Sequence, residues 1–553
     1  MALVAVVALV PLVVAVRAGQ QGWTPTSDLA LTALWTRDVF SNETPLVGPF
    51  SATLQMANES DAPETVNHPG PSLYWALVLP YMITGWSPKA LLFGRVLVDW
   101  ACLGGIVWLC RRRPRPTDPT ILLLIVGFMY ARWEADTLVT PWNPFAALPA
   151  YLLALVASWR LATGCAGALP VLVAASSFAV QAHFGYAIPL LFPALTATIS
   201  FLAQSGSPRD ALERLRRLDS FWVAVAIALV MWLPPLIDQV AGSGNLAAIV
   251  SNSAGATFDG PIPALGNVGR ALGLPPLWSR TVEGSFDLLS RGSISEKVVP
   301  FLVVASMAAL MRATARKGDR DALTLLLIAM AALAGGYVAL SLLPRASVFA
   351  AHAFRWLQPL SAFVWFALAF ALCRLLHSSA RRAQTRSRSA HMVQVASTFA
   401  TAVVVVACAS RAVFGPLFEP EENAFVAAVH ELRRQLEPVL DPDATYLTIS
   451  GGDAFIAGLG SALAVQLEPE GYSFVFDDDR AVPLQGWSRK WDGTNAEYSL
   501  TIMARWDSAV PASWPPERAV ASVVLEADRE DPKDKLLVWA EIGRLAQAED
   551  SSG

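Results

Sequence analysis

Residues 67–86 read NHPGPSLYWALVLPYMITGW and lie between two long apolar segments. The run from Ser72 onward is amphipathic, with Trp and Tyr side chains that suit the headgroup belt of a bilayer. We expect it to form a helix in the membrane interface, interrupted by Pro80 and ended by Gly85. The two prolines and the glycine of HPGP cannot continue a helix, so they predict a rigid turn with His68 at the head of this helix.

A second stretch of the same loop, TPTSDLALTALWTRDVF at 24–40, also has helical periodicity. Thr26 or Ser27 can cap this predicted helix. Asp28 opens it, just after the first apolar segment, and Asp38 lies about three turns further along. The loop therefore predicts two helices that lie in the interface and do not cross the bilayer.

The composition is that of a polytopic membrane protein. Of 553 residues, 54% are hydrophobic and 16% are charged, and the mean hydropathy is +0.44. These values lie outside the range of an ordinary soluble domain. A bilayer core about 30 Å thick needs roughly 20 apolar residues per helix, fewer where an end is buried in protein. We therefore predict about eleven transmembrane helices, at residues 2–17, 88–110, 119–131, 144–159, 167–183, 186–203, 221–236, 297–311, 322–343, 356–376 and 392–412.

Basic residues set the predicted orientation in the membrane. They gather in connections that fall on one side, which the positive-inside rule makes cytoplasmic. These connections are 111–116, Arg160, 209–217, 312–320 and 381–388. We therefore expect a multi-pass protein of the cytoplasmic (plasma) membrane with a cytoplasmic N-terminus. The connections expected outside are 18–87, 132–143, 237–296 and 344–355, together with the tail after 412.

The tail is acidic and has the pattern of a soluble domain. Helices are predicted at 421–440 and 453–468, and strands at 444–450, 472–477, 498–504 and 519–527. Helices that alternate with short strands favour a small α/β domain. No phosphate-binding glycine loop or serine-nucleophile motif occurs in it. DDDR at 477–480 is interpreted as a solvated turn, with cation binding as the alternative.

The first outer loop resembles that of the GT-C superfamily of polytopic membrane glycosyltransferases. The shared features are an acidic residue just after the first span, two juxtamembrane helices, and a His-Pro element before the second of them. SPKALLFGRVLVDW at 87–100 and HAFRWLQPLSAF at 352–363 resemble motifs of a second and a late span in that group. WLPPLIDQVAGSGNLAAI at 232–249 resembles actinobacterial members. The group includes protein O-mannosyltransferases, aminoarabinose transferases and arabinosyltransferases.

This resemblance implies an enzyme with a GT-C-like transmembrane catalytic domain over 1–412 and an extracytoplasmic α/β accessory domain over 413–553. The expected donor is a sugar on a polyprenyl phosphate. The acceptor is expected to be a cell-envelope glycan, lipid or protein on the outer face of the membrane. Membrane lipids are expected partners and nucleic acid is not. No cofactor is certain, and a divalent cation is possible.

The resemblance also assigns roles to individual residues. By position Asp28 would be the general base for an acceptor hydroxyl, with a helix cap as the alternative. The second outer loop, ARWEADTLVTPWNP at 131–144, carries Asp136, which is preferred as a second catalytic acid. Glu134 and Asn143 are candidate substrate contacts, although Glu134 can pair locally with Arg132 and loop charges are often only solvated.

Cationic and histidine side chains would complete the site. Arg355 is expected to hold the donor phosphate, because a guanidinium pairs bidentately with phosphate oxygens, and interfacial snorkelling is the alternative. His68 is a second candidate phosphate ligand. His183, beside Gln181, is a candidate substrate contact or an ordinary polar turn. Arg345 and His352 are weaker candidates.

Two other functions were weighed against this one. A transporter or flippase of lipid-linked sugars would need charged residues near the bilayer midplane, broken helices and an internal repeat. Apart from Arg95 and Asp99, which are four residues apart and predicted to pair, the spans are nearly free of charge. A membrane-anchored sensor with an outer ligand-binding domain would not require so many spans or so patterned a first loop.

Overall fold

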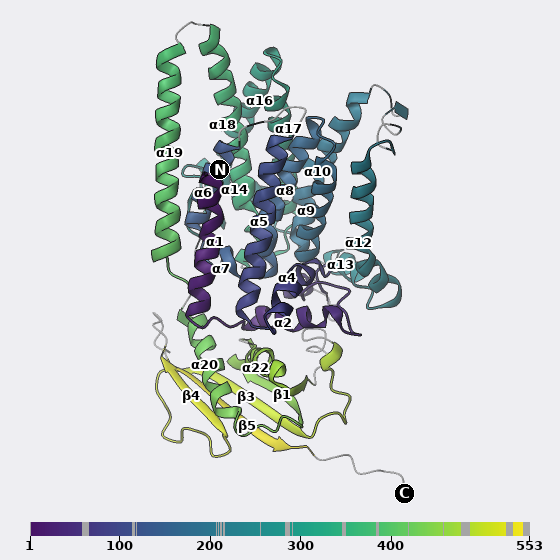
Figure 1. Cartoon of the computed structure of the whole chain (residues 1–553), viewed down its shortest axis with the longest axis vertical. Coiled ribbons are helices and arrows are strands. Elements are labelled where there is room, and N and C mark those ends of the chain that lie inside the picture. Colours follow the sequence, from purple (N-terminus) through teal and green to yellow (C-terminus); the bar gives the residue numbers. More distant parts are fainter. Residues whose placement is uncertain are drawn as a thin grey trace.

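The structure is a computed structural model of a helical bundle with an α/β domain at one end (Figure 1). The bundle and the domain are formed by consecutive parts of the chain, and α19 of the bundle leads directly into α20 of the domain. The residues described are 2–545, except for 58–65, 113–116, 118, 206, 208, 211–212, 214–215, 255, 283–287, 290, 346–349, 383–385, 419, 457, 477–486 and 527–534.

All eleven apolar stretches predicted from the sequence lie on helices. These are α1 (Ala2–Gln20), α5 (Lys89–Arg111), α6 (Thr120–Arg132), α8 (Asn143–Ala162), α9 (Ala168–Ala182), α10 (Ala187–Leu202), α12 (Asp219–Ala241), α16 (Ile294–Arg316), α17 (Arg320–Ser341), α18 (Leu357–Arg382) and α19 (Arg386–Phe414). Among the described residues, eight helices are long and apolar enough to cross a membrane. The apolar helices α6, α9 and the second half of α19 are shorter, so eleven crossings do not follow from length alone.

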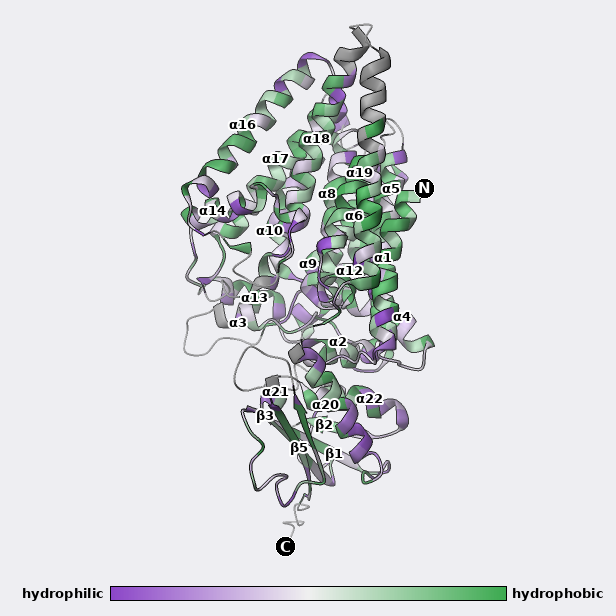
Figure 2. Cartoon of the chain, turned by 90° about the vertical axis from the view of Figure 1, so that its left-hand side faces the viewer, coloured by the Kyte–Doolittle hydropathy of each residue, from purple (hydrophilic) through white to green (hydrophobic). Residues whose placement is uncertain are grey.

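Burial within the bundle matches the distribution of apolar residues. The helix α8 is entirely buried and packs against α5, α9 and α10. In contrast, α12 and α16 expose large apolar side chains such as Leu229, Val230 and Phe301. In Figure 2 most of α16 has the colour of hydrophobic residues. Exposed apolar helices around a buried central helix are what a bilayer environment requires.

The predicted pair of charges inside the bundle is confirmed. The Arg95 guanidinium bonds to the Asp99 carboxylate, and both side chains are buried. Arg95 also donates to the Phe145 carbonyl at 3.0 Å, and the Tyr130 hydroxyl donates to Asp99 at 3.1 Å. These bonds join α5 to α6 and α8, so the pair has a structural role.

The two helices predicted in the first loop are also present. They are α2 (Ser27–Arg37), which continues into the 3-10 helix η1 (Asp38–Phe40), and α4 (Ser72–Ile83). The prediction that Pro80 interrupts α4 is wrong, because the helix runs through it. At Gly94 of α5 a Cβ atom would lie 3.3 Å from the Pro80 ring, so close packing on α5 supports α4 at this point.

The HPGP turn is fixed by contacts with distant segments. The backbone of His68 pairs with Pro49 and Gly48 at 2.8 Å each, close to the short helix α3 (Ala52–Ala57). A Cβ atom at Gly70 would lie 2.5 Å from Gln181 Oε1, so a larger residue would force the Gln181 side chain at the end of α9 to move. The turn is therefore packed closely against α9.

The connection at 237–296 is more than an outer loop. It contains α13 (Asn245–Ala254), α14 (Pro261–Leu272) and η4 (Leu277–Ser279). Asn245 bonds to Asn67 beside the HPGP turn. However, α14 packs against α16 and α17, and Ser361 of α18 donates to the Ala271 carbonyl at 2.7 Å. Figure 2 places α14 beside α16, farther from the α/β domain than α13.

The C-terminal domain is the predicted α/β domain. It comprises α20 (Pro420–Leu436), β1 (Thr445–Gly452), α21 (Asp453–Ile456), α22 (Leu459–Leu467), β2 (Ser473–Phe476), β3 (Tyr498–Asp507), β4 (Ala521–Glu526) and β5 (Lys535–Arg544). The strand order is β2-β1-β3-β5-β4. Strand β1 runs parallel to β2 and β3, whereas β5 is antiparallel to β3 and β4.

Two details of this domain differ from the prediction. The helix expected at 453–468 is two helices, and Gly458, with φ of 58°, is the N-cap of the second. Strand β5 was not predicted. Its residues Leu536, Leu537 and Val538 are all buried, so the strand lacks the alternating pattern that identifies a half-exposed strand. The DDDR sequence at 477–480 lies outside the described residues.

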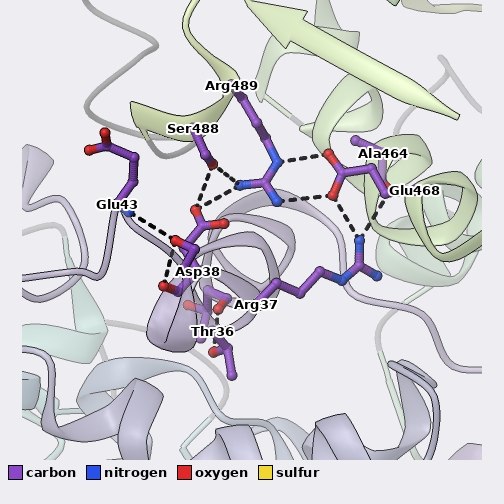
Figure 3. Close-up of polar contacts among 10 residues, drawn as sticks. Thr36, Arg37, Asp38, Glu43, Ala464, Glu468, Ser488 and Arg489 are labelled. Carbon is purple, nitrogen blue, oxygen red and sulfur yellow. Dashed lines mark hydrogen bonds and ion pairs between the residues drawn. The ribbon is translucent and has the colours of Figure 1, made fainter. Parts of the chain in front are cut away.

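Charged residues attach the domain to the first loop at one end of α2 (Figure 3). Arg489 donates to Asp38 Oδ2 at 2.8 Å and to both oxygens of Glu468, at 2.7 and 2.9 Å. Ser488 donates to the same Asp38 oxygen at 3.0 Å, and Arg37 donates to Glu468 at 3.0 Å. One arginine thus bridges a carboxylate of the bundle and a carboxylate of the domain.

The other end of α2 also contacts the domain. Gln466 of α22 donates to the Thr24 hydroxyl at 2.7 Å. A Cβ atom at Gly458 would lie 2.9 Å from the Ser27 Cα, so the start of α22 packs directly on the residue before Asp28. Both ends of α2 are therefore held by the C-terminal domain.

Candidate functional site

Trp142 is the centre of a polar cluster at the end of the bundle that faces the α/β domain. Its indole nitrogen donates to Asp28 Oδ2 at 3.0 Å. Its ring centroid lies 4.8 Å from Phe145 and 4.8 Å from His352. Trp142 immediately precedes α8, and the short helix η6 (Ala351–Phe354) precedes α18. The cluster thus joins the first loop, the second outer loop and the start of α18.

Asp28 occupies the first turn of α2, and the residue as a whole is exposed. Surrounding protein nevertheless raises the pKa of Asp28 through desolvation, and the hydrogen bond from Trp142 acts in the opposite direction. Among the described residues, the Asp28 side chain accepts a hydrogen bond from this indole and makes none with the backbone of α2. The preceding residue, Ser27, has φ of 47°, in the left-handed region that is uncommon for residues other than glycine. This geometry differs from that of a helix cap.

Three histidines continue the cluster away from Asp28. The ring of His352 lies 6.3 Å from that of His183, which lies 4.6 Å from that of His68. They come from η6, from the end of α9 and from the turn before α4, respectively. A row of contacts therefore runs from Asp28 through Trp142, His352 and His183 to His68.

Two of these histidines are buried and neutral. Burial lowers the pKa of His68 to about 3, and His352 adds to the effect. Burial also lowers the pKa of His183 well below its usual value. His68 and His352 lower it further, by smaller amounts. Their Nδ1 atoms accept backbone N–H bonds from Phe184 and Gly185, both at 3.2 Å. A neutral ring that accepts through Nδ1 carries its proton on Nε2, so each can donate one hydrogen bond from there.

Arg355, three residues after His352, is paired. It donates to Glu134 Oε2 at 2.9 Å and to the Val282 carbonyl at 3.0 Å. Its guanidinium also lies 5.5 Å from the centroid of the Phe145 ring, which in turn contacts Trp142. Glu134 therefore pairs with Arg355 across the fold. This differs from the local pairing with Arg132 considered from the sequence.

The remaining candidates lie at or near the same segments. Asn143 donates to the Ala182 carbonyl at 3.0 Å and so fastens the start of α8 to the end of α9. Asp136 is half-buried in the first turn of α7 (Ala135–Val139), on the same loop as Trp142. Arg345 is exposed, and its backbone pairs with Thr257. The described residues contain no group of three or more His, Cys, Asp and Glu side chains placed to hold a metal ion.

Two cavities border this cluster. One, of about 260 Å³, is lined by His68 and His183 together with apolar residues of α17 and Trp356. The other, of about 510 Å³, is lined by Glu134, Arg132 and Arg411 together with apolar residues of α6 and α19. The His183 to His352 contact joins the first cavity to the cluster, and the Glu134 to Arg355 pair joins the second.

Two members of this cluster are not evident from the sequence. Trp142 is not among the residues that the sequence singles out, and His352 is one of its weaker candidates. A sequence signal for Trp142 is its position in PWNP at 141–144, where prolines on both sides fix the backbone at the start of a buried helix. Nothing in the sequence shows that its partners are Asp28 and His352, because these lie more than 100 residues away in either direction.

The fold and the cluster define a polytopic membrane protein with a polar site at one end of its bundle, beneath an α/β domain. No family model matches the chain, and no curated protein matches it. Among solved structures, the chain is similar to ArnT from Cupriavidus metallidurans, whose crystal structure contains undecaprenyl phosphate. The TM-score is 0.46, the sequence identity is 14%, and the match covers 97% of each chain.

Proposed function

We propose that the chain is a GT-C-type glycosyltransferase. It would transfer a hexosyl or pentosyl group from a polyprenyl-phosphate donor to a glycan, lipid or protein acceptor on the outer face of the plasma membrane. The observation that carries the proposal is the cluster centred on Trp142, which connects the carboxylate of Asp28 with Arg355 and with two buried histidines. These residues come from four separate segments of the chain.

The proposed reaction is a displacement at the anomeric carbon of the donor sugar. The acceptor hydroxyl attacks this carbon, its proton passes to the Asp28 carboxylate, and the bond between the sugar and the phosphate breaks. The phosphate leaves on the polyprenyl lipid with the bonding electron pair. Desolvation raises the pKa of Asp28, which makes it a stronger base than an aspartate with an ordinary pKa as long as it remains ionised.

The leaving phosphate gains negative charge and needs hydrogen-bond donors. A guanidinium has five N–H donors, so Arg355 can bind phosphate oxygens while it keeps its bond to Glu134. The Nε2 protons of His68 and His183 supply neutral donors beside the smaller cavity. Asp136 is proposed as the second catalytic carboxylate. Its neighbours Glu134 and Asn143 are proposed to shape the substrate site.

The transporter alternative is less well supported. A transporter requires charged residues near the middle of the bundle, and the candidates for this role are Arg95 and Asp99. Both side chains are buried and bonded to one another, to the Phe145 carbonyl and to the Tyr130 hydroxyl. A pair that is fully engaged in helix packing has little capacity to bind a transported group.

The test is replacement of Asp28 by Asn in the full chain. Membranes that contain each variant are supplied with a panel of radiolabelled polyprenyl-phosphate sugars, and transfer to endogenous acceptors is measured. We expect Asp28→Asn to lower transfer by a factor of about 10² to 10⁴, the usual contribution of a general base. The matched control is Glu43→Gln, an exposed carboxylate of the same loop, which should leave transfer unchanged. Full transfer by Asp28→Asn would exclude Asp28 as the base.

A further inference from the structure

The larger cavity has two kinds of wall. Its apolar side is formed by Phe128 and Ala131 of α6 and by Ala407 and Phe414 of α19. Phe414 is 82% exposed, on a helix that turns other apolar side chains outward. Because exposed apolar helix faces in a membrane protein contact lipid chains, this side of the cavity borders the bilayer. The charged side is formed by Arg132, Glu134 and Arg411.

Arg411 is held in place with part of its guanidinium uncommitted. The residue is only 8% exposed. Its Nε donates to the Trp133 carbonyl at 2.7 Å and its Nη1 to the Pro416 carbonyl at 3.0 Å. Its Nη2 is buried and has no hydrogen-bond partner in the described part of the chain. A buried cationic donor without a partner is costly, so a ligand that accepts a hydrogen bond here would be stabilised.

Gly415 shows that this arrangement depends on a small residue. A Cβ atom at Gly415 would overlap Arg411 Nη1 and would lie 2.6 Å from the Arg411 carbonyl oxygen. Only glycine therefore lets the guanidinium fold back against the end of α19. The cation is positioned at the edge of the cavity by the backbone around it.

The charges around the cavity favour an anion. Glu134 is the acidic residue among those that line it, and this carboxylate is paired with Arg355 at 2.9 Å. Arg132 adds a second cation, which is exposed and donates to Thr281 at 3.4 Å. A ligand that matches both walls must combine an anionic oxygen group with an apolar chain.

We propose that this cavity binds a lipid through its phosphate, with the phosphate on Arg411 and the chain along α6 and α19. The shared chemistry is a phosphate ester attached to a long apolar chain. Such a ligand could be an anionic phospholipid of the bilayer or a polyprenyl phosphate. The proposal concerns binding alone and does not require Asp28 or any transfer step.

The experiment measures lipid retention by the purified full chain in phosphatidylcholine nanodiscs, by native mass spectrometry. Phosphatidylglycerol and undecaprenyl phosphate are titrated separately, and inorganic phosphate is tested as a probe without a chain. Arg411→Gln should lower the affinity for the lipid by about 10- to 100-fold, as expected for loss of a charge-assisted hydrogen bond. Ala407→Phe fills the apolar wall and keeps Arg411, so it should weaken lipid binding and leave any phosphate binding unchanged.

Two controls separate the proposal from general charge effects and from the proposed function. Arg312→Gln removes the same charge from an exposed site on α16 that does not line the cavity, and should retain lipid normally. Asp28→Asn should also retain lipid, whatever its transfer activity. Arg411-dependent retention of either lipid supports the proposal, and the preferred lipid identifies the source. If Arg411→Gln does not fold, lipid retention by Ala407→Phe decides whether the proposal holds. The proposal is overturned if the folded variants retain as much lipid as the unchanged chain.

Discussion

Replacing Arg489 by Ala tests how firmly the α/β domain holds the first loop. Arg489 is the cation between Asp38 and Glu468, and the side chains of Arg489 and Asp38 are only 9% and 7% exposed. Breaking a buried ion pair by removing one partner costs about 3–5 kcal/mol, because it leaves an uncompensated buried charge. Glu468 keeps Arg37 at 3.0 Å, so most of this cost should fall on Asp38.

The stability lost in Arg489→Ala should therefore be partly restored by a second substitution, at Asp38. Asp38→Asn removes the charge that Arg489→Ala leaves unpaired, so the double variant should be more stable than the sum of the single effects predicts. For groups in direct contact we expect a coupling of about 1–3 kcal/mol. Because a multidomain membrane protein seldom unfolds in one step, the measurement is limited proteolysis of the connection between α19 and α20 alongside thermal unfolding.

The pH dependence gives an independent check. Desolvation already raises the pKa of Asp38, and Arg489 opposes that effect. Without Arg489 the pKa of Asp38 should rise further. A carboxyl with a raised folded-state pKa destabilises the protein when it is ionised, and the penalty falls as the pH drops through that pKa. The loss of stability caused by Arg489→Ala should therefore be smaller at pH 5 than at pH 8.

The control is Arg434→Ala, an exposed arginine of α20 that pairs with Glu431 within the same helix. It should leave the proteolysis pattern and the unfolding temperature unchanged. The reasoning is refuted if Arg489→Ala resists protease and unfolds like the unchanged chain. It is also refuted if adding Asp38→Asn lowers stability by the full sum of the two single effects.

Three further predictions concern the site. Trp142→Phe removes the hydrogen bond that lowers the pKa of Asp28, so the acid limb of the pH–rate profile should move to higher pH, and a profile at its original position would contradict this. His68→Gln keeps a side-chain N–H and should retain more transfer than His68→Leu. Because the pKa of His68 is about 3, neither variant should change the pH dependence of transfer between pH 5 and 8. The third prediction concerns orientation in the membrane. Glu43→Cys should react with a membrane-impermeant maleimide in intact cells, and Arg312→Cys should not. The reverse pattern would place Asp28 in the cytoplasm.

The sequence was most informative where a feature depends on local periodicity. The helices of the bundle, α2, α4 and the α/β character of the tail all follow from hydrophobic spacing and turn residues. Strand β5 does not, because a central strand buried on both faces has a continuous apolar run that resembles a buried helix segment. Pro80 was misjudged because its effect depends on the packing of α4 against α5 at Gly94.

The sequence identifies candidate site residues but not their arrangement. Asp28, Arg355, His68 and His183 were all chosen from the sequence, and each belongs to the contact network around Trp142. Which of them touch was not predictable, since the Arg355 to Glu134 pair spans 221 positions and the His68 bond to the backbone of Phe184 spans 116. Contacts at such separations are set by how the helices pack, which no local pattern records.

The contacts of α2 have a consequence for how the two parts of the chain work together. This eleven-residue helix carries Asp28 at its start, and it ends beside Asp38. Its start packs against Gly458 and its end is bonded to Arg489 and Glu468, so both of its ends rest on the C-terminal domain. In the bundle, the cluster holds Asp28 itself through one hydrogen bond from Trp142. The division of the chain near residue 412 is therefore a boundary of composition, whereas the position of the proposed base depends on residues from both sides of it.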